Sequence, residues 1–243
     1  MIQLQRPRDI TALFGDSLRV FFRHAFVFIA LSAAVIVPVD LVVLGIGLEQ
    51  FTADYDETPS IAEAAVPTAV GFLVVVPLIT AICIHTLRAV AEGGRASAGQ
   101  SFVAGFEAFT PLFFAVLLAA VGIALGLVAL IVPGMYLAVR WFFVPQAVVL
   151  EGARGPDALA RSSAVVQGFW WRTFGLVIVV NLAAAVPGVV LSAPFSALAS
   201  ATDRAVWSMV GTICAESVTT PFLALFATLL YYDLRARRAG APA

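Results

Sequence analysis

The sequence predicts an all-α, polytopic membrane protein with six transmembrane helices, and three observations lead to this fold class. Of the 243 residues, 61% are hydrophobic and only 12% are charged, whereas soluble domains carry about 25% charged residues. The apolar residues gather in runs close to the roughly 20 residues that a membrane-spanning helix needs. The arginines fall in alternate connections between these runs, a pattern typical of membrane proteins. We therefore expect a single integral membrane domain over residues 1–243.

Six apolar runs are the candidate spans. They cover residues 25–48, 66–90, 109–132, 135–150, 173–198 and 206–232. The fourth run is short, and Pro133-Gly134, a dipeptide typical of turns, separates it from the third. We therefore expect the third and fourth spans to form a tight helical hairpin.

Three amphipathic segments precede pairs of these spans, at residues 9–22, 98–109 and 157–171. Their apolar residues recur at helical spacing, and aromatic residues lead into the following span. This pattern is typical of helices that lie in the membrane interface. The chain therefore contains three repeats of one unit, an interfacial amphipathic helix followed by a helical hairpin. Each repeat includes a Val-Pro pair in a comparable place, namely Val37-Pro38, Val132-Pro133 and Val186-Pro187.

The arginines predict the orientation in the membrane. All fourteen basic residues are arginine, and twelve of them lie in the N-terminal segment, the tail and the alternate connections between them. The connection at residues 49–65 is acidic and has no basic residue, and Arg204 is the one arginine in the opposite connections. Under the positive-inside rule both termini are cytoplasmic. Richness in Arg, Ala, Val and Gly indicates a high-GC bacterial genome, so we expect a multi-pass protein of the bacterial plasma (inner) membrane.

Four polar residues within the spans are the candidate site residues: Asp40, Arg140, Asn181 and Glu216. Ionisable residues inside a membrane are costly and often functional. A helical rise of about 1.5 Å per residue puts the three charged residues at overlapping depths in the outer half of the bilayer. We therefore predict that Arg140 pairs with Asp40, Glu216 or both. Such a cluster is either an outward-facing polar or proton-coupled site or a structural ion pair, and a third interpretation has Arg140 reaching the outer headgroups.

Other kinds of chemistry have little support. His24 and His85 have no third ligand at metal spacing, and Ser162 and Ser163 have no neighbouring histidine and acid for a hydrolytic triad. We therefore expect no metal, no cofactor and no catalytic residue. The net charge of −1 gives no basic field for nucleic acid. The expected partners are the lipid bilayer and other membrane proteins. Asp233 and Arg237, four residues apart on one helical face, are predicted to pair.

Three segments carry a family resemblance. They read LIVPGMYLAVRWFFVPQAVVLEG, ALARSSAVVQGFWWRTFG and PFLALFATLLYYDLRAR, in this order. The chain resembles the membrane-domain family named after glycerophosphoryl diester phosphodiesterase, and is similar to the YciC-like bacterial polytopic membrane proteins. The clearest motifs are Pro133-Gly134, Glu151-Gly152, Arg161-Ser162 and the segment Tyr232-Asp233-x-Arg235. In relatives with the enzymatic activity, the likeness implies a separate catalytic barrel with clustered His, Glu and a divalent metal. Since this chain has only two histidines, we expect no phosphodiesterase activity.

These observations favour a non-catalytic bacterial inner-membrane protein that acts as a scaffold or accessory component in envelope or lipid processes. The alternative is a small transporter or channel, with the four embedded polar residues lining a cavity in the outer half of the bilayer. An intramembrane enzyme ranks below both, because the sequence shows no pair of nucleophile and base.

Overall fold

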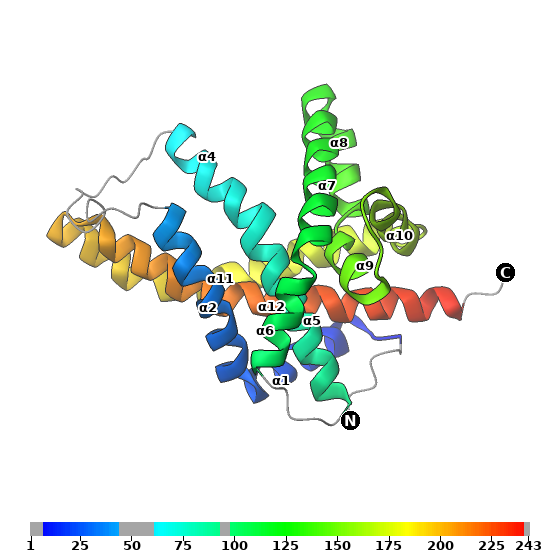
Figure 1. Ribbon diagram of the computed structural model, residues 1–243, viewed down its shortest axis with the longest axis horizontal. Coiled ribbons are helices and arrows are strands. Elements are labelled where there is room, and N and C mark those ends of the chain that lie inside the picture. The colour runs from blue at the N-terminus through cyan, green and yellow to red at the C-terminus, as the bar shows by residue number, and fades with distance from the viewer. Residues whose placement is uncertain (1–6, 44–60, 93–97, 241–243) are drawn as a thin grey trace.

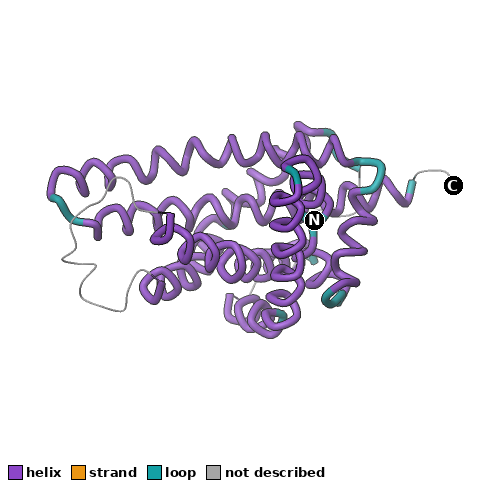
Figure 2. Tube along the Cα trace, turned by 90° about the horizontal axis from the view of Figure 1, so that it is seen from above, coloured by secondary structure: helices purple, strands orange, loops and turns teal. Residues whose placement is uncertain are grey.

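The computed structural model describes residues 7–43, 61–92 and 98–240, and in these ranges the chain is helical with no strand (Figures 1 and 2). Six helical segments are long and apolar enough to cross a membrane. They confirm the predicted all-α polytopic fold and follow the predicted spans in order. Residues 44–48 of the first predicted span, and most of the acidic connection after it, lie outside the described residues.

The three predicted repeats are present as three consecutive units. The first comprises α1 (Ile10–Arg23), α2 (Ala25–Val43) and a continuous rod of α4 (Ile61–Val70), the π-helix η1 (Gly71–Val75) and α5 (Val76–Ala91). The second comprises α6 (Ala98–Glu107), α7 (Phe109–Ala129), α8 (Ile131–Arg140) and α9 (Val144–Glu151). The third comprises α10 (Pro156–Val166), α11 (Trp170–Thr202) and α12 (Ala205–Ala239). In each unit a short helix leads into two apolar segments that are long enough to cross a membrane.

The turn between α7 and α8 lies at Leu130, and the predicted turn at Pro133-Gly134 is wrong. Leu130 has extended backbone angles, with φ −164° and ψ 147°, and α8 starts at the next residue. Pro133 fits the first turn of α8, because the N–H groups of a first turn have no partner within the helix and proline lacks this group. Gly134 faces α7 so closely that an added Cβ would lie 2.6 Å from the backbone nitrogen of Leu127. The Pro-Gly pair therefore lets the two helices approach and does not form the turn itself.

Two spans depart from regular α-helix just before a proline. A proline ring clashes with the carbonyl four residues earlier; Pro38, Pro187 and Pro221 are nevertheless accommodated inside α-helices, whereas the helix geometry changes at Pro77 and Pro145. The π-helix η1 ends directly before Val76-Pro77, and the gap between α8 and α9 directly precedes Val144-Pro145. The fourth span therefore consists of two short helices.

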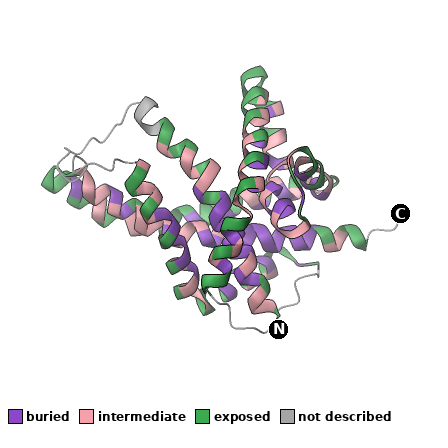
Figure 3. Cartoon of the chain, in the orientation of Figure 1, coloured by how far each residue is buried: buried purple, intermediate pink, exposed green. Residues whose placement is uncertain are grey.

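The core of the molecule surrounds the C-terminal part of α12. Nearly every residue from Pro221 to Leu234 is buried, and α1, α2, α5 and α10 all contact this helix. Phe14 and Phe21 of α1 place their rings 4.7 Å and 5.9 Å from those of Phe226 and Phe222, between centroids. Figure 3 shows the buried residues gathered in this region. We call residues 7–23, 144–172 and 221–239 the hub.

Apolar arms extend from the hub. In Figure 1 the α7–α8 hairpin stands across the direction of the long α11–α12 hairpin. Both arms expose large apolar side chains, with Val128 near the α7–α8 turn 86% exposed and Leu182 of α11 65% exposed. Such surfaces are stable against lipid acyl chains, which are as apolar as the side chains themselves.

Candidate functional site: the polar network of the hub

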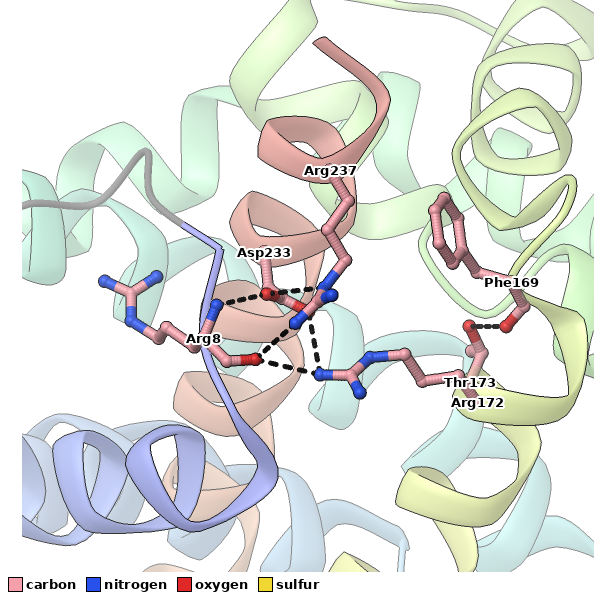
Figure 4. A network of polar contacts seen from close by, with 6 residues as sticks. All are labelled: Arg8, Phe169, Arg172, Thr173, Asp233 and Arg237. Atoms are coloured by element: carbon pink, nitrogen blue, oxygen red, sulfur yellow. Dashed lines mark hydrogen bonds and ion pairs between the residues drawn. The ribbon is translucent and has the colours of Figure 1, made fainter. Parts of the chain in front are cut away.

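The carboxylate of Asp233 is the centre of the polar network in the hub. Asp233 lies on α12 and its side chain is 0% exposed. Its Oδ1 accepts a hydrogen bond from the backbone N–H of Arg8 at 2.6 Å. Nε of Arg237 lies 3.1 Å from both carboxylate oxygens, and Nη2 of Arg172 donates to Oδ2 at 3.2 Å. Figure 4 shows these donors converging on the carboxylate from three parts of the chain.

The peptide carbonyl of Arg8 completes this arrangement. It accepts hydrogen bonds from Nη2 of Arg172 at 3.0 Å and from Nη2 of Arg237 at 2.6 Å. The side chain of Arg8 is buried, and its Nε donates to Asp16 of α1 at 3.1 Å. The N-terminal segment is therefore tied to the start of α11 and the end of α12. We call Arg8, Arg172, Asp233 and Arg237 the Asp233 cluster.

Local sequence explains part of the Asp233 cluster. Asp233 and Arg237 are one helical turn apart on α12, and the predicted pair between them is confirmed. Arg172 lies in the first turn of α11, next to Thr173, whose hydroxyl donates to the carbonyl of Phe169 at 3.0 Å. A buried ion cluster seldom makes a fold much more stable than apolar side chains at the same positions would. Removing one partner, however, leaves the other charges uncompensated and costs several kcal/mol.

A second carboxylate, that of Glu151, joins α9, α10 and α12. Glu151 ends α9, and Gly152 follows in the left-handed conformation with φ 66°, the usual way to terminate a helix. Oε2 of Glu151 accepts a hydrogen bond from Arg161 at 3.0 Å, and Oε1 accepts one from the hydroxyl of Tyr231. Nη1 of Arg235 forms an ion pair with Oε1 at 3.0 Å. Hydrogen bonds to Glu151 and Asp157 raise the pKa of the Arg161 guanidinium, so Arg161 stays charged.

Ser162 of α10 bridges the gap between α8 and α9. Its hydroxyl donates to the carbonyl of Arg140 at 2.9 Å and accepts from the backbone N–H of Phe143 at 3.1 Å. Both backbone groups lie at a break in the helix and lack a regular helical partner. Ser162 is 0% exposed and replaces the bonds that the break removes.

The predicted cluster of embedded polar residues is only partly brought together. Asp40 lies on α2 and Glu216 on α12, and these two helices contact one another. Arg140 joins neither, because α8 ends beside α10 and the start of α11. Its Nη1 lies 3.5 Å from the hydroxyl of Tyr136, and its guanidinium carbon lies 5.7 Å from the centroid of that ring. Asn181 is exposed on α11 and donates to the carbonyl of Val177 at 2.8 Å.

Sequence reasoning did not find the Asp233 cluster as a whole. The spacing of Asp233 and Arg237 indicated one contact, and Glu151, Arg161 and Ser162 were noted as motif residues without a role. Nothing local indicates that Arg8 and Arg172 converge on the same carboxylate, since Arg8 is 225 residues away from it.

A small open cavity of about 280 Å³ adjoins the Asp233 cluster, lined by Pro7, Tyr232, Arg235, Ala236 and Ala239. It is at the lower limit of ordinary ligand pockets, which begin near roughly 300 Å³. Within the described ranges no three His, Cys, Asp or Glu side chains gather as metal ligands would.

Comparison with known proteins gives one match. Residues 95–234 match the family described as a domain of unknown function, DUF7847, and this range contains Glu151, Ser162 and Asp233. No curated protein and no solved structure matches the chain. Because the matched range covers more than half of the 243 residues, the chain belongs to the DUF7847 family.

Proposed function

We propose that this protein is a non-catalytic component of the bacterial inner membrane that serves as a scaffold or accessory in envelope or lipid processes. The observation that carries the proposal is that the charged groups in the hub form hydrogen bonds and ion pairs with one another. Asp233 and Glu151 each hold donors from different helices. A network of this kind holds helices in fixed positions and leaves its carboxylates little capacity to act on a substrate. The resemblance to the glycerophosphoryl diester phosphodiesterase membrane-domain family agrees with a role in lipid processes and stays a prediction.

We further propose that the hub faces the cytoplasm. Arginines of the hub concentrate at one end of the α11–α12 hairpin, whereas Arg204 lies at its opposite turn. The positive-inside rule then makes the hub end cytoplasmic.

Reporter fusions test this orientation. Fused at the C-terminus, a green fluorescent protein is expected to fluoresce and alkaline phosphatase to be inactive. Phosphatase inserted between Asp203 and Arg204 is expected to be active, because that turn lies on the other side. The reverse pattern at both positions would contradict the orientation.

A specific observation favours transport as the second candidate function. Asp40 lies on α2 and Glu216 on α12, two helices that contact one another, and neither acid forms an ion pair with an arginine among the described residues. Acids on neighbouring helices in a membrane are suited to exchange protons or to hold a cation.

Cysteine accessibility separates the two functions. In a background with Cys83→Ala and Cys214→Ala, single cysteines replace Asp40, Arg140, Asn181 and Glu216, and intact cells are treated with a membrane-impermeant maleimide. For a scaffold we expect labelling at none of the four positions. The positive control is Asp203→Cys in the exposed α11–α12 turn. Labelling at both Asp40 and Glu216 would instead support an outward-facing cavity and contradict the scaffold.

A further inference from the structure

We propose that Arg140, Tyr136 and Trp170 form a binding site for the phosphate group of an anionic phospholipid, on the hub side of the membrane. The inference concerns a site that the scaffold role does not require, and it rests on three features of the α8–α11 contact. These are an uncompensated guanidinium, a set of aromatic rings that fixes its depth, and an apolar hairpin beside it.

The guanidinium of Arg140 has no acidic partner among the described residues. Its one hydrogen bond is the long contact of 3.5 Å with the hydroxyl of Tyr136, although an arginine carries five N–H donors. Arg161 and Arg235 of the hub are more exposed than Arg140, yet both bind the carboxylate of Glu151. Arg140 therefore differs from them in having most of its donors available.

Aromatic rings hold Arg140 at the level of the lipid headgroups. The ring of Tyr136 stacks on that of Trp170 with centroids 5.9 Å apart, and Nε1 of Trp170 donates to the carbonyl of Tyr136 at 3.3 Å. Trp171, the next residue, is 77% exposed. Tyrosine and tryptophan concentrate at membrane–water interfaces.

The hydrogen bond to the backbone of Arg140 is a second indication that this residue lies at the level of the lipid headgroups. Its carbonyl is bound by Ser162 of α10, and α10 carries the exposed ion pair of Asp157 and Arg161 on its surface. A helix that presents an exposed ion pair lies at the aqueous boundary, so we place Arg140, where α8 ends halfway along the apolar segment Ile131–Glu151, close to that boundary.

The start of α8 is apolar and exposed, which favours a lipid over free phosphate. Ile131 and Val132, at the start of α8, are 70% and 76% exposed, and they lie about 12–14 Å along the helix from Arg140, at roughly 1.5 Å per residue. This surface fits acyl chains while the guanidinium fits the phosphate above them. Arginine binds phosphate through two parallel N–H bonds, and the hydroxyl of Tyr136 supplies a further donor.

Native mass spectrometry of the full chain tests the proposal. The protein is titrated with dioleoyl phosphatidylglycerol and, separately, with dioleoyl phosphatidylcholine, whose choline group neutralises the phosphate charge. We expect tight retention of one phosphatidylglycerol by the wild type and about tenfold weaker retention by Arg140→Gln, since glutamine loses the charge-assisted hydrogen bonds that a guanidinium makes with a phosphate. The matched control Arg204→Gln, at the far turn of α11–α12, is expected to retain it like the wild type.

Two further measurements are needed. One distinguishes a bound lipid from free phosphate, and the other distinguishes a loss of binding from a loss of folding. Excess inorganic phosphate is expected not to displace the lipid, and displacement would overturn the lipid assignment. Arg140→Lys keeps the charge without the planar fork and is expected to retain lipid at an intermediate level, while its backbone still binds Ser162. Equal retention by wild type, Arg140→Lys and Arg140→Gln, or equal retention of the two lipids by the wild type, would overturn the proposal.

Discussion

Asp233→Asn is expected to lower the free energy of unfolding by about 3–5 kcal/mol, the cost of removing one partner from a buried ion cluster. The asparagine keeps the size of the side chain but loses the charge that compensates Arg172 and Arg237. Those two side chains are only 23% and 28% exposed, so water replaces the carboxylate poorly. The amide group of asparagine also adds two N–H donors at a position that N–H donors of Arg8, Arg172 and Arg237 already surround.

The melting temperature of the purified protein in detergent measures this effect. For a chain of this size a change of 1 kcal/mol shifts the midpoint by about 2–4 °C, so we expect a fall on the order of 10 °C. The matched control is Asp203→Asn, the same substitution at an exposed turn residue with φ 53°, where asparagine is equally well tolerated. Equal shifts in the two variants would show that the Asp233 cluster contributes no special stability. Because Asp233 also binds the N–H of Arg8, faster proteolysis of the N-terminal segment should accompany the lower midpoint.

Ser162→Ala is expected to destabilise the fold by about 1–3 kcal/mol, the cost of leaving a buried polar group without a partner. The alanine cannot accept from the N–H of Phe143, a residue that is 0% exposed. It also cannot donate to the carbonyl of Arg140. The neighbouring substitution Ser163→Ala makes the same chemical change on the same helix but removes neither contact.

The same melting experiment compares these two serine variants. We expect Ser162→Ala to melt several degrees below the wild type and Ser163→Ala to stay close to it. Amide hydrogen exchange localises the cause, since Phe143 and its neighbours should exchange faster in Ser162→Ala alone. Unchanged exchange at the α8–α9 break would mean that Ser162 does not hold it.

The fold was predictable where the signal is local. Long apolar runs, amphipathic periodicity and the placement of arginines depend only on neighbouring residues, and they led to the observed order of spans and short helices. The turn at Pro133-Gly134 was wrong because proline is equally compatible with the first turn of a helix. The close packing of Gly134 on Leu127, which decides between the two, is a property of the folded hairpin.

The site was less predictable, because its contacts join distant parts of the chain. Depth estimates from the sequence assumed that the fourth span runs straight from Pro133-Gly134, whereas it starts at Ile131 and breaks after Arg140. Arg140 therefore meets Tyr136 and the start of α11, away from Asp40 and Glu216. Asp40 and Glu216 lie on the contacting helices α2 and α12, and depth alone does not indicate which helices are neighbours.

The position of α12 at the centre of the core has a consequence for biosynthesis. Helices α1, α2 and α5 leave the ribosome long before the segment Pro221–Leu234 on which they pack. Until that segment is made, their apolar faces have only lipid, chaperones or one another as partners. Closing the contact between Arg8 and Asp233 spans 225 residues, and contacts of such separation form late because the chain entropy must be lost first. Newly made chains should therefore stay loosely packed during insertion and acquire their final shape only after translation of the last helix.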